Sequence, residues 1–129
     1  MLIEFAVTNF RSIMERQALN MAASSYFHEL ESLNTFVPDQ DDGLPRLVRS
    51  TVLYGPNASG KSTLIQALRF VKYQVLNSQK ESQAGDAIDV APFKLTATSR
   101  GADSEFEVTF VEHGIRYEFG FCCNRERFT

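Results

Sequence analysis

Residues 46–77, RLVRSTVLYGPNASGKSTLIQALRFVKYQVLN, combine three local patterns that decide the fold. The first nine residues end in an apolar run, Val52 to Tyr54, which predicts a buried strand over 46–54. Gly55 and Pro56 then stop the strand. A helical period begins at residue 60 and continues to 77. A strand, a glycine-rich turn and a helix therefore follow one another without interruption.

The helix predicted over 60–77 has one apolar and one polar face. Its apolar residues recur at spacings of 4, 3 and 4, which places them on one side of a helix: Leu64, Leu68, Val71 and Val75. Gln66, Arg69 and Lys72 fall on the outer side. Burial of each apolar side chain contributes about 1.5–3 kcal/mol, so this face is expected to pack on a core.

The turn between strand and helix, residues 55–63, matches the pattern G-x-x-x-x-G-K-[ST] in full. Gly55 and Gly60 let the backbone curl so that successive N–H groups point inward and form an anion nest. The helix that opens at Gly60 aims its positive end at the same place. The predicted phosphate-binding residues are Asn57, Ala58, Ser59, Gly60, Lys61, Ser62 and Thr63.

Two side chains of this turn have specific predicted roles. Lys61 carries a full positive charge to the β- and γ-phosphates and is the candidate catalytic residue. Ser62 is placed to bind Mg²⁺ through its hydroxyl group. The alternative is a glycine-rich turn without a ligand, but that would leave an ammonium beside inward-facing amides with no anion. The flanking strand and helix favour the phosphate site.

The N-terminal region predicts strands before this unit. Residues 2–10 are rich in β-branched and aromatic residues and predict a strand, with Phe5 and Val7 on one face. Residues 13–23 allow a strand or a helix, and we favour a strand paired with the first. Residues 24–45 are irregular, with a short helical turn near 27–33 and a solvated acidic loop at 39–42.

The C-terminal region predicts an antiparallel sheet. Residues 77–91 are polar and indicate a loop. Within 92–123, three β-like runs follow, at 93–98, 105–111 and 115–122, and the last two alternate apolar and polar residues. Gly114 supplies the positive φ that a tight hairpin between them needs.

Composition limits the function classes. The chain has 129 residues, 43% hydrophobic and 22% charged, which suits one globular domain. A net charge of −3 argues against a nucleic-acid contact over the whole surface. The sequence has no run long enough to span a bilayer and no secretory pattern at its start, so we expect a cytoplasmic protein without membrane contact. Cys122 and Cys123 suggest neither a zinc site nor a disulfide framework.

The string GPNASGKST resembles the Walker A loop of ABC-type ATPase heads of the SMC/RecF kind. The start of the chain, with Asn9-Phe10-Arg11-Ser12, is similar to the first strand and N-F-R-S turn of these heads. The closest likeness is to stand-alone bacterial AAA-family ATPases of the phage-defence and restriction-associated kind. The resemblance implies ATP and Mg²⁺ as ligands, Arg11 and Ser12 near the nucleotide, and a second head as partner.

The sequence also departs from that family. A strand ending in Asp-Glu, a signature loop and a switch histidine are not visible, and Glu112 is a turn residue rather than a catalytic acid. Residues 122–129 end without a closing element, which leaves an exposed strand edge. We therefore expect an α/β P-loop NTPase fold of the ABC-ATPase-like kind, and specifically its N-terminal lobe with an antiparallel β subdomain. This lobe is incomplete without a C-terminal lobe or partner chain.

Three functional alternatives follow from these observations. The first is an ATPase head spanning 1–129, with N-terminal strands at 1–23, the strand–Walker A–helix unit at 46–77 and the β region at 92–123, active in DNA handling or phage defence. The second is another P-loop enzyme, but the N-K-x-D and D-x-x-G strings of a GTPase do not occur. The third is a non-hydrolysing module that uses ATP for dimerisation. DNA or RNA contact would rest on the arginine pairs 46/49 and 125/127.

Overall fold

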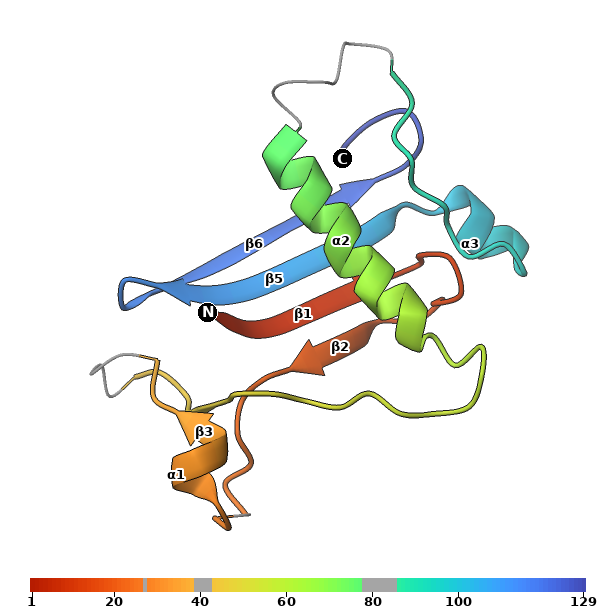
Figure 1. Cartoon of the computed structure of the whole chain (residues 1–129). Coiled ribbons are helices and arrows are strands. Elements are labelled where there is room, and N and C mark those ends of the chain that lie inside the picture. Colours follow the sequence, from red (N-terminus) through yellow and green to blue (C-terminus); the bar gives the residue numbers. More distant parts are fainter. Residues whose placement is uncertain (27, 39–42, 78–85) are drawn as a thin grey trace.

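The computed structural model describes residues 1–26, 28–38, 43–77 and 86–129. A long helix, α2, crosses one face of a four-stranded antiparallel sheet, and a small two-stranded sheet with a short helix lies below the main sheet in this view and contacts it through the buried Leu47 (Figure 1). The elements are β1 (Leu2–Thr8), β2 (Gln17–Asn20), α1 (Glu31–Asn34), β3 (Thr35–Phe36), β4 (Leu47–Val48), α2 (Lys61–Asn77), α3 (Ala97–Gly101), β5 (Ser104–Glu112) and β6 (Ile115–Cys123).

The main sheet has the strand order β2-β1-β5-β6, with every neighbouring pair antiparallel. The predictions of a first strand, of a second strand paired with it and of a β5–β6 hairpin are confirmed. The hairpin turns at His113 and Gly114, with φ of 50° and 74°. Two consecutive positive φ values give the twist that a two-residue hairpin needs.

The core lies between α2 and the sheet. Phe5, Val7 and Phe106 are almost fully buried there, and Phe106 stacks edge-on against Phe10 with ring centroids 5.4 Å apart. From α2, the buried residues are Thr63, Leu64, Ala67 and Val71. The prediction of the apolar face was wrong at the C-terminal end of the helix, where the Val75 side chain is 57% exposed. The helix runs past the part of the sheet that could cover it.

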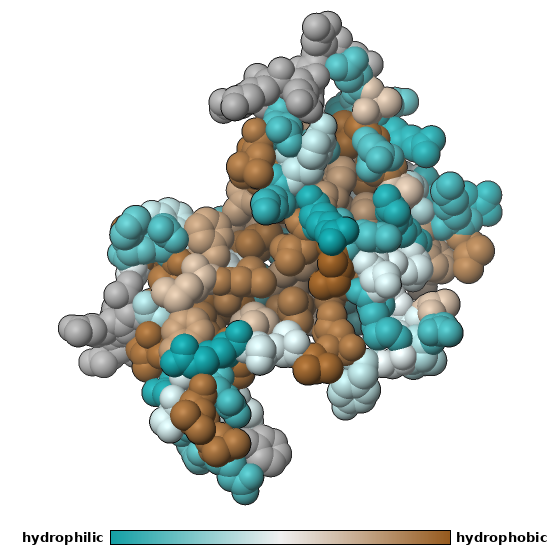
Figure 2. Space-filling model, in the orientation of Figure 1, coloured by the Kyte–Doolittle hydropathy of each residue, from teal (hydrophilic) through white to brown (hydrophobic). Residues whose placement is uncertain are grey.

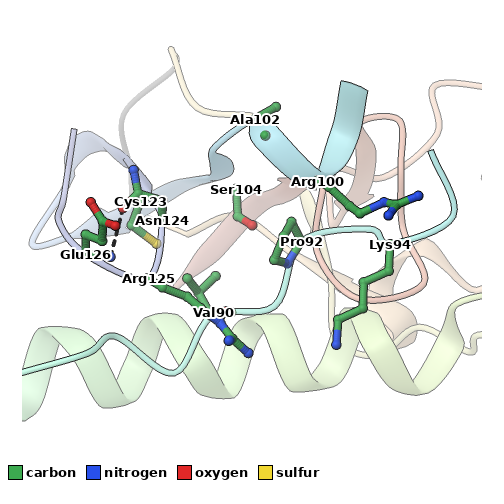
Figure 3. A pocket seen from close by; sticks show the side chains of 11 residues that line it. Val90, Pro92, Lys94, Arg100, Ala102, Ser104, Cys123, Asn124, Arg125 and Glu126 are labelled. Atoms are coloured by element: carbon green, nitrogen blue, oxygen red, sulfur yellow. Dashed lines mark hydrogen bonds between the residues drawn. The ribbon is translucent and has the colours of Figure 1, made fainter. Parts of the chain in front are cut away.

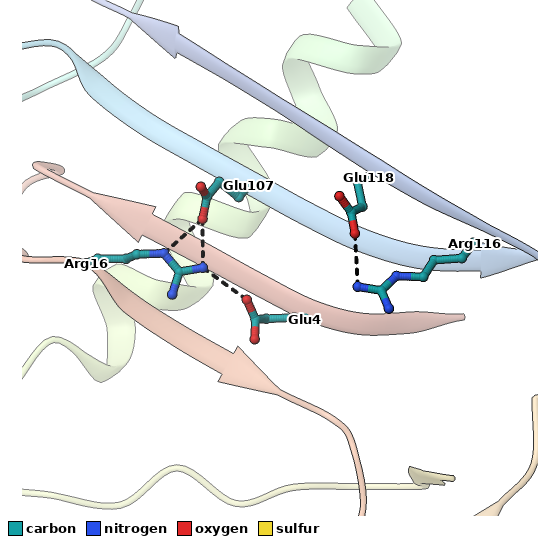
Figure 4. A network of polar contacts seen from close by, with 5 residues as sticks. All are labelled: Glu4, Arg16, Glu107, Arg116 and Glu118. Atoms are coloured by element: carbon teal, nitrogen blue, oxygen red, sulfur yellow. Dashed lines mark hydrogen bonds and ion pairs between the residues drawn. The ribbon is translucent and has the colours of Figure 1, made fainter. Parts of the chain in front are cut away.

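The face of the sheet opposite α2 is charged. Arg16 forms ion pairs with Glu4 of β1 at 3.0 Å and with Glu107 of β5 at 2.7 Å (Figure 4). These two carboxylates raise the pKa of the Arg16 guanidinium, mainly through the hydrogen bond with Glu107. Ion pairs between solvated side chains add little to stability, so this face is polar without contributing much to the stability of the fold.

The strand predicted over 46–54 was mostly wrong. Only Leu47 and Val48 form a strand, and their partner is β3. Residues 51–55 form no strand, and Val52 and Tyr54 are 79% and 91% exposed. In the described part of the chain, this apolar run belongs to neither sheet.

Two predictions in the C-terminal region were also wrong. Residues 93–98 form no strand, because Thr96 instead caps α3 by accepting a hydrogen bond from the Ser99 N–H. The last residues do have a closing element: Phe128 pairs with Cys123, and the Thr129 N–H donates to the Cys122 carbonyl at 2.7 Å. The acidic loop predicted at 39–42 lies outside the described residues.

A broad apolar surface remains beside α2. Tyr117 and Phe119 continue the core-facing side of β6 and are 43% and 45% exposed. Figure 2 shows hydrophobic atoms gathered in the middle of this view of the molecule. None of the helices in the described residues has the length and apolar character that a bilayer crossing requires.

Candidate functional site

The Gly55–Gly60 loop forms a tight turn immediately before α2. The Ser59 N–H donates to the Pro56 carbonyl at 3.3 Å, and the Leu64 N–H makes the first helical bond, to Gly60, at 2.9 Å. Ala58 and Gly60 have φ of 64° and 97°, whereas Ser59 between them does not have a positive φ. Such alternation of backbone sign turns neighbouring N–H groups toward one side, which is the geometry of an anion nest.

Lys61 lies at the first position of α2 and points back over the loop. Its ammonium group donates to the carbonyl of Gly55 and, at 2.8 Å, to that of Pro56. Both acceptors belong to the same loop, so the positive charge lies at the mouth of the turn. The four-carbon stem is flexible, and the group can exchange these carbonyls for phosphate oxygens.

The two loop glycines differ in what they permit. A Cβ on Gly55 would lie 3.0 Å from the Ser59 hydroxyl oxygen, which is too close for a normal contact. A Cβ on Gly60 would meet Ile13 at an ordinary 3.4 Å, but its φ of 97° strains any other residue. Gly60 is therefore favoured by its backbone conformation, whereas a side chain at position 55 would require the Ser59 hydroxyl to shift.

The N-F-R-S turn packs against the start of α2. The hydroxyl oxygens of Ser12 and Thr63 are 2.5 Å apart, a hydrogen bond between the turn and the helix. The Arg11 guanidinium donates to the Gln66 side chain at 3.3 Å. Gln66 lies one helical turn after Ser62 on the same face, so Arg11 lies near the N-terminal end of α2.

Asn9 fixes this turn on its other side. Its side-chain amide donates to three carbonyls around α3, those of Ser99, Ala102 and Asp103, at 2.8–3.2 Å. Its side-chain oxygen accepts from the Phe93 N–H at 3.0 Å, and the residue is buried. Asn9 belongs to the turn that the sequence singled out, but no role was predicted for it. The signal that could have found it is an asparagine at the end of a strand, where positive φ is common for this residue type.

The structure brings the predicted site residues together at one end of α2. Asn57, Ala58 and Ser59 are exposed in the loop, and the hydroxyl-bearing Ser62 is exposed on the first turn. Thr63 is buried, with its hydroxyl directed to Ser12. Among the described residues, no group of three or more His, Cys, Asp or Glu side chains could hold a metal ion.

Outside the loop, the sequence offers three aromatic side chains as possible stacking partners for a base, Tyr26, Phe27 and Phe36, and nothing in the sequence selects one of them. Tyr26 is exposed, Phe36 packs under the Arg49 guanidinium at 5.5 Å, and Phe27 lies outside the described residues. Arg46 is engaged by Glu31 at 3.0 Å. The first arginine pair is therefore occupied by protein groups.

Residues 50–128 match the family described as "AAA domain, putative AbiEii toxin, Type IV TA system". The chain belongs to this AAA-domain family. The matched residues cover more than half of the chain and include the Walker A loop, α2 and the β5–β6 hairpin. No curated protein matches the chain.

The AAA-domain family consists of P-loop ATPases, and nucleotide binding with ATPase activity is its general property. The N-F-R-S turn lies outside the matched range, as do β1 and β2. The contacts of Ser12 and Arg11 with α2 therefore connect the AAA-domain match to the part of the chain that precedes it.

Proposed function

We propose that this chain binds Mg²⁺-ATP through residues 55–63 as part of an ABC/SMC-like ATPase head. In this proposal, backbone N–H groups of Asn57 to Gly60 hold the phosphates. The Ser59 N–H then leaves the Pro56 carbonyl, and Lys61 moves from the loop carbonyls to the β- and γ-phosphates. Arg11 and Ser12 support the site from the N-F-R-S turn. The observation that carries the proposal is the alternating backbone of the loop directly before a lysine-bearing helix start.

The residues present suit Mg²⁺ only in part. The Ser62 hydroxyl is exposed at the first turn of α2, where a P-loop serine binds the ion together with phosphate oxygens. When bound, the ion would neutralise charge that develops on the phosphates. The described residues contain no group of three or more His, Cys, Asp or Glu side chains that could hold a metal ion. In this proposal, the carboxylate that helps to hold the ion comes from the C-terminal lobe.

Hydrolysis in this proposal requires completion by a C-terminal lobe and a second head. The supporting observation is the apolar run before the loop, because Val52 and Tyr54 are exposed and lie in no strand. Exposure of these apolar side chains to water costs free energy, and a partner strand would reduce that cost by covering them and pairing with their backbone. The completed head would act in DNA handling or in phage defence, in keeping with the toxin named in the family's description.

Nucleotide titration tests the proposal. A fluorescent ATP analogue with Mg²⁺ should bind the wild-type chain saturably, and Lys61→Ala should weaken binding by about 100-fold or more, because a charge-assisted contact to two phosphates is lost. Lys72→Ala is the matched control, since Lys72 is an exposed lysine on the outer face of the same helix. Equal affinity in Lys61→Ala and wild type would refute the proposed site.

A further inference from the structure

A cavity of about 490 Å³ lies at the other end of the sheet from the hairpin turn. Its floor includes Val90, Ser104 and Cys123, each of which is almost fully buried. Burial raises the pKa of the Cys123 thiol to about 12, so this side chain is neutral there. The volume falls in the range of small-molecule pockets.

Three cationic side chains line this cavity, and they come from three different segments. Lys94 lies in the segment between α2 and α3, Arg100 belongs to α3, and Arg125 follows β6. In Figure 3, the Lys94 amine and the Arg125 guanidinium extend in the same direction, whereas Arg100 turns to the side. This gathering of positive charge is local, because the whole chain carries −3.

These cations are not neutralised by ion pairs within the described parts of the chain. Arg125 donates through Nε to the Val90 carbonyl at 3.4 Å, and Arg100 donates through Nε to the Thr96 carbonyl at 3.3 Å. Both bonds leave the terminal amino groups of the guanidinium available. Glu126 is the one acid among the described lining residues, so the charged lining carries a net positive charge.

The walls are held in place before any ligand arrives. Asn9 ties Phe93 to the α3 region through the hydrogen bonds described above. The Ser104 hydroxyl donates to the Asn9 carbonyl at 2.5 Å, and the Asn124 side chain donates to Asp103 at 3.0 Å. A cavity whose walls are fixed in this way loses little conformational entropy on binding.

We propose that this cavity binds a small phosphorylated organic molecule, such as a sugar phosphate, separately from the Walker A site. A phosphate monoester carries −1.5 to −2 charges near neutral pH, which suits two parallel cations and a third at the side. The apolar side chains of Val90 and Pro92 in the lining would contact the carbon skeleton. Because the described residues place no aromatic side chain in the lining, base stacking of single-stranded nucleic acid is not provided for.

Calorimetric titration of the full chain with ribose 5-phosphate tests the proposal. The titration uses Lys61→Ala as the background, so that the Walker A loop contributes little. Saturable binding is expected, and ribose without phosphate should not bind. The double variant Lys94→Gln/Arg125→Gln should weaken binding by about tenfold, because two charge-assisted contacts are lost at a partly exposed site.

A second double variant, Arg69→Gln/Lys72→Gln, removes two exposed cations from the outer face of α2 and should leave the affinity unchanged. Proton NMR of the Val90 methyl groups should show a shift on addition of ribose 5-phosphate, which places the ligand at the cavity. Absence of saturable binding, or equal weakening by both double variants, would overturn the proposal. Binding of an oligonucleotide without binding of ribose 5-phosphate would overturn it in favour of a nucleic-acid surface.

Discussion

The two flanks of the Walker A loop differ sharply in how they are held. On the C-terminal flank, α2 buries Leu64, Ala67 and Val71 against the sheet and takes hydrogen bonds from the N-F-R-S turn. On the N-terminal flank, residues 51–55 are exposed and form no strand. One flank of the Walker A loop is therefore anchored by α2 and the N-F-R-S turn, whereas the other flank, residues 51–55, pairs with no strand among the described residues.

This asymmetry explains how the loop can form beside a segment that pairs with no strand. The loop conformation rests on the positive φ values of Ala58 and Gly60, and Gly60 directly precedes the anchored helix α2. The N-terminal flank contributes only its connection to Gly55. We therefore expect substitutions on the two flanks to have very different effects on stability.

The largest difference in the free energy of unfolding is expected between the variants Phe106→Ala and Tyr54→Ser. Phe106 is fully buried against Phe10 and Phe70, so its truncation should lower the free energy of unfolding by about 3–5 kcal/mol. Tyr54 is exposed, so its replacement should change that free energy by less than about 0.5 kcal/mol. Urea unfolding followed by circular dichroism measures both, and a large loss in Tyr54→Ser would show that residues 51–55 are packed after all.

An intermediate effect is expected for Asn9→Ala. The change removes the partner of three carbonyls and one N–H near α3, and a buried group left unpaired costs about 1–3 kcal/mol. The control is Asn20→Ala, because the Asn20 side chain is exposed and accepts a hydrogen bond from the Ala22 N–H of its own segment. The same urea experiment should rank Asn9→Ala well below Asn20→Ala in stability. Equal stability would contradict the role given to Asn9.

Arg11→Ala should change stability least, because its effect falls on the site instead. Arg11 is exposed and bonds Gln66, so unfolding should change little, whereas affinity for Mg²⁺-ATP should fall by about three- to tenfold. Arg16→Ala is the control, because Arg16 pairs with Glu4 and Glu107 on the opposite face of the sheet. Unchanged ATP affinity in Arg11→Ala would make Arg11 an ordinary surface residue.

The local sequence pattern was sufficient to predict the elements that are amphipathic and that pair with their neighbours in the chain. The alternation in 105–111 and 115–122 predicted β5 and β6, because each strand pairs with the next across a short turn. The spacing of Leu64, Leu68 and Val71 likewise predicted α2. The glycine-rich string predicted a turn directly before α2, and Gly60 adopts there the positive φ that favours glycine.

The local sequence pattern was not sufficient to predict secondary structure or burial where contacts with distant residues decide them. Val52 and Leu53 have the composition of a buried strand, but a strand also needs a partner, and that is not a local property. Val75 fits the helical period, yet the sheet ends before it. The run at 93–98 has the composition of a strand, but the Thr96 side chain caps α3 and takes the backbone elsewhere.

Amide hydrogen exchange of the loop, with and without Mg²⁺-ATP, asks whether its backbone holds the nucleotide. If the N–H groups of residues 57–63 bind the phosphates, their exchange should slow on nucleotide addition, while amides in the centre of β1 and β5 stay unchanged. Lys61→Ala should abolish the slowing at the same nucleotide concentration. Loop exchange that is unaffected by nucleotide, or protection that persists fully in Lys61→Ala, would show that the loop is not the phosphate site.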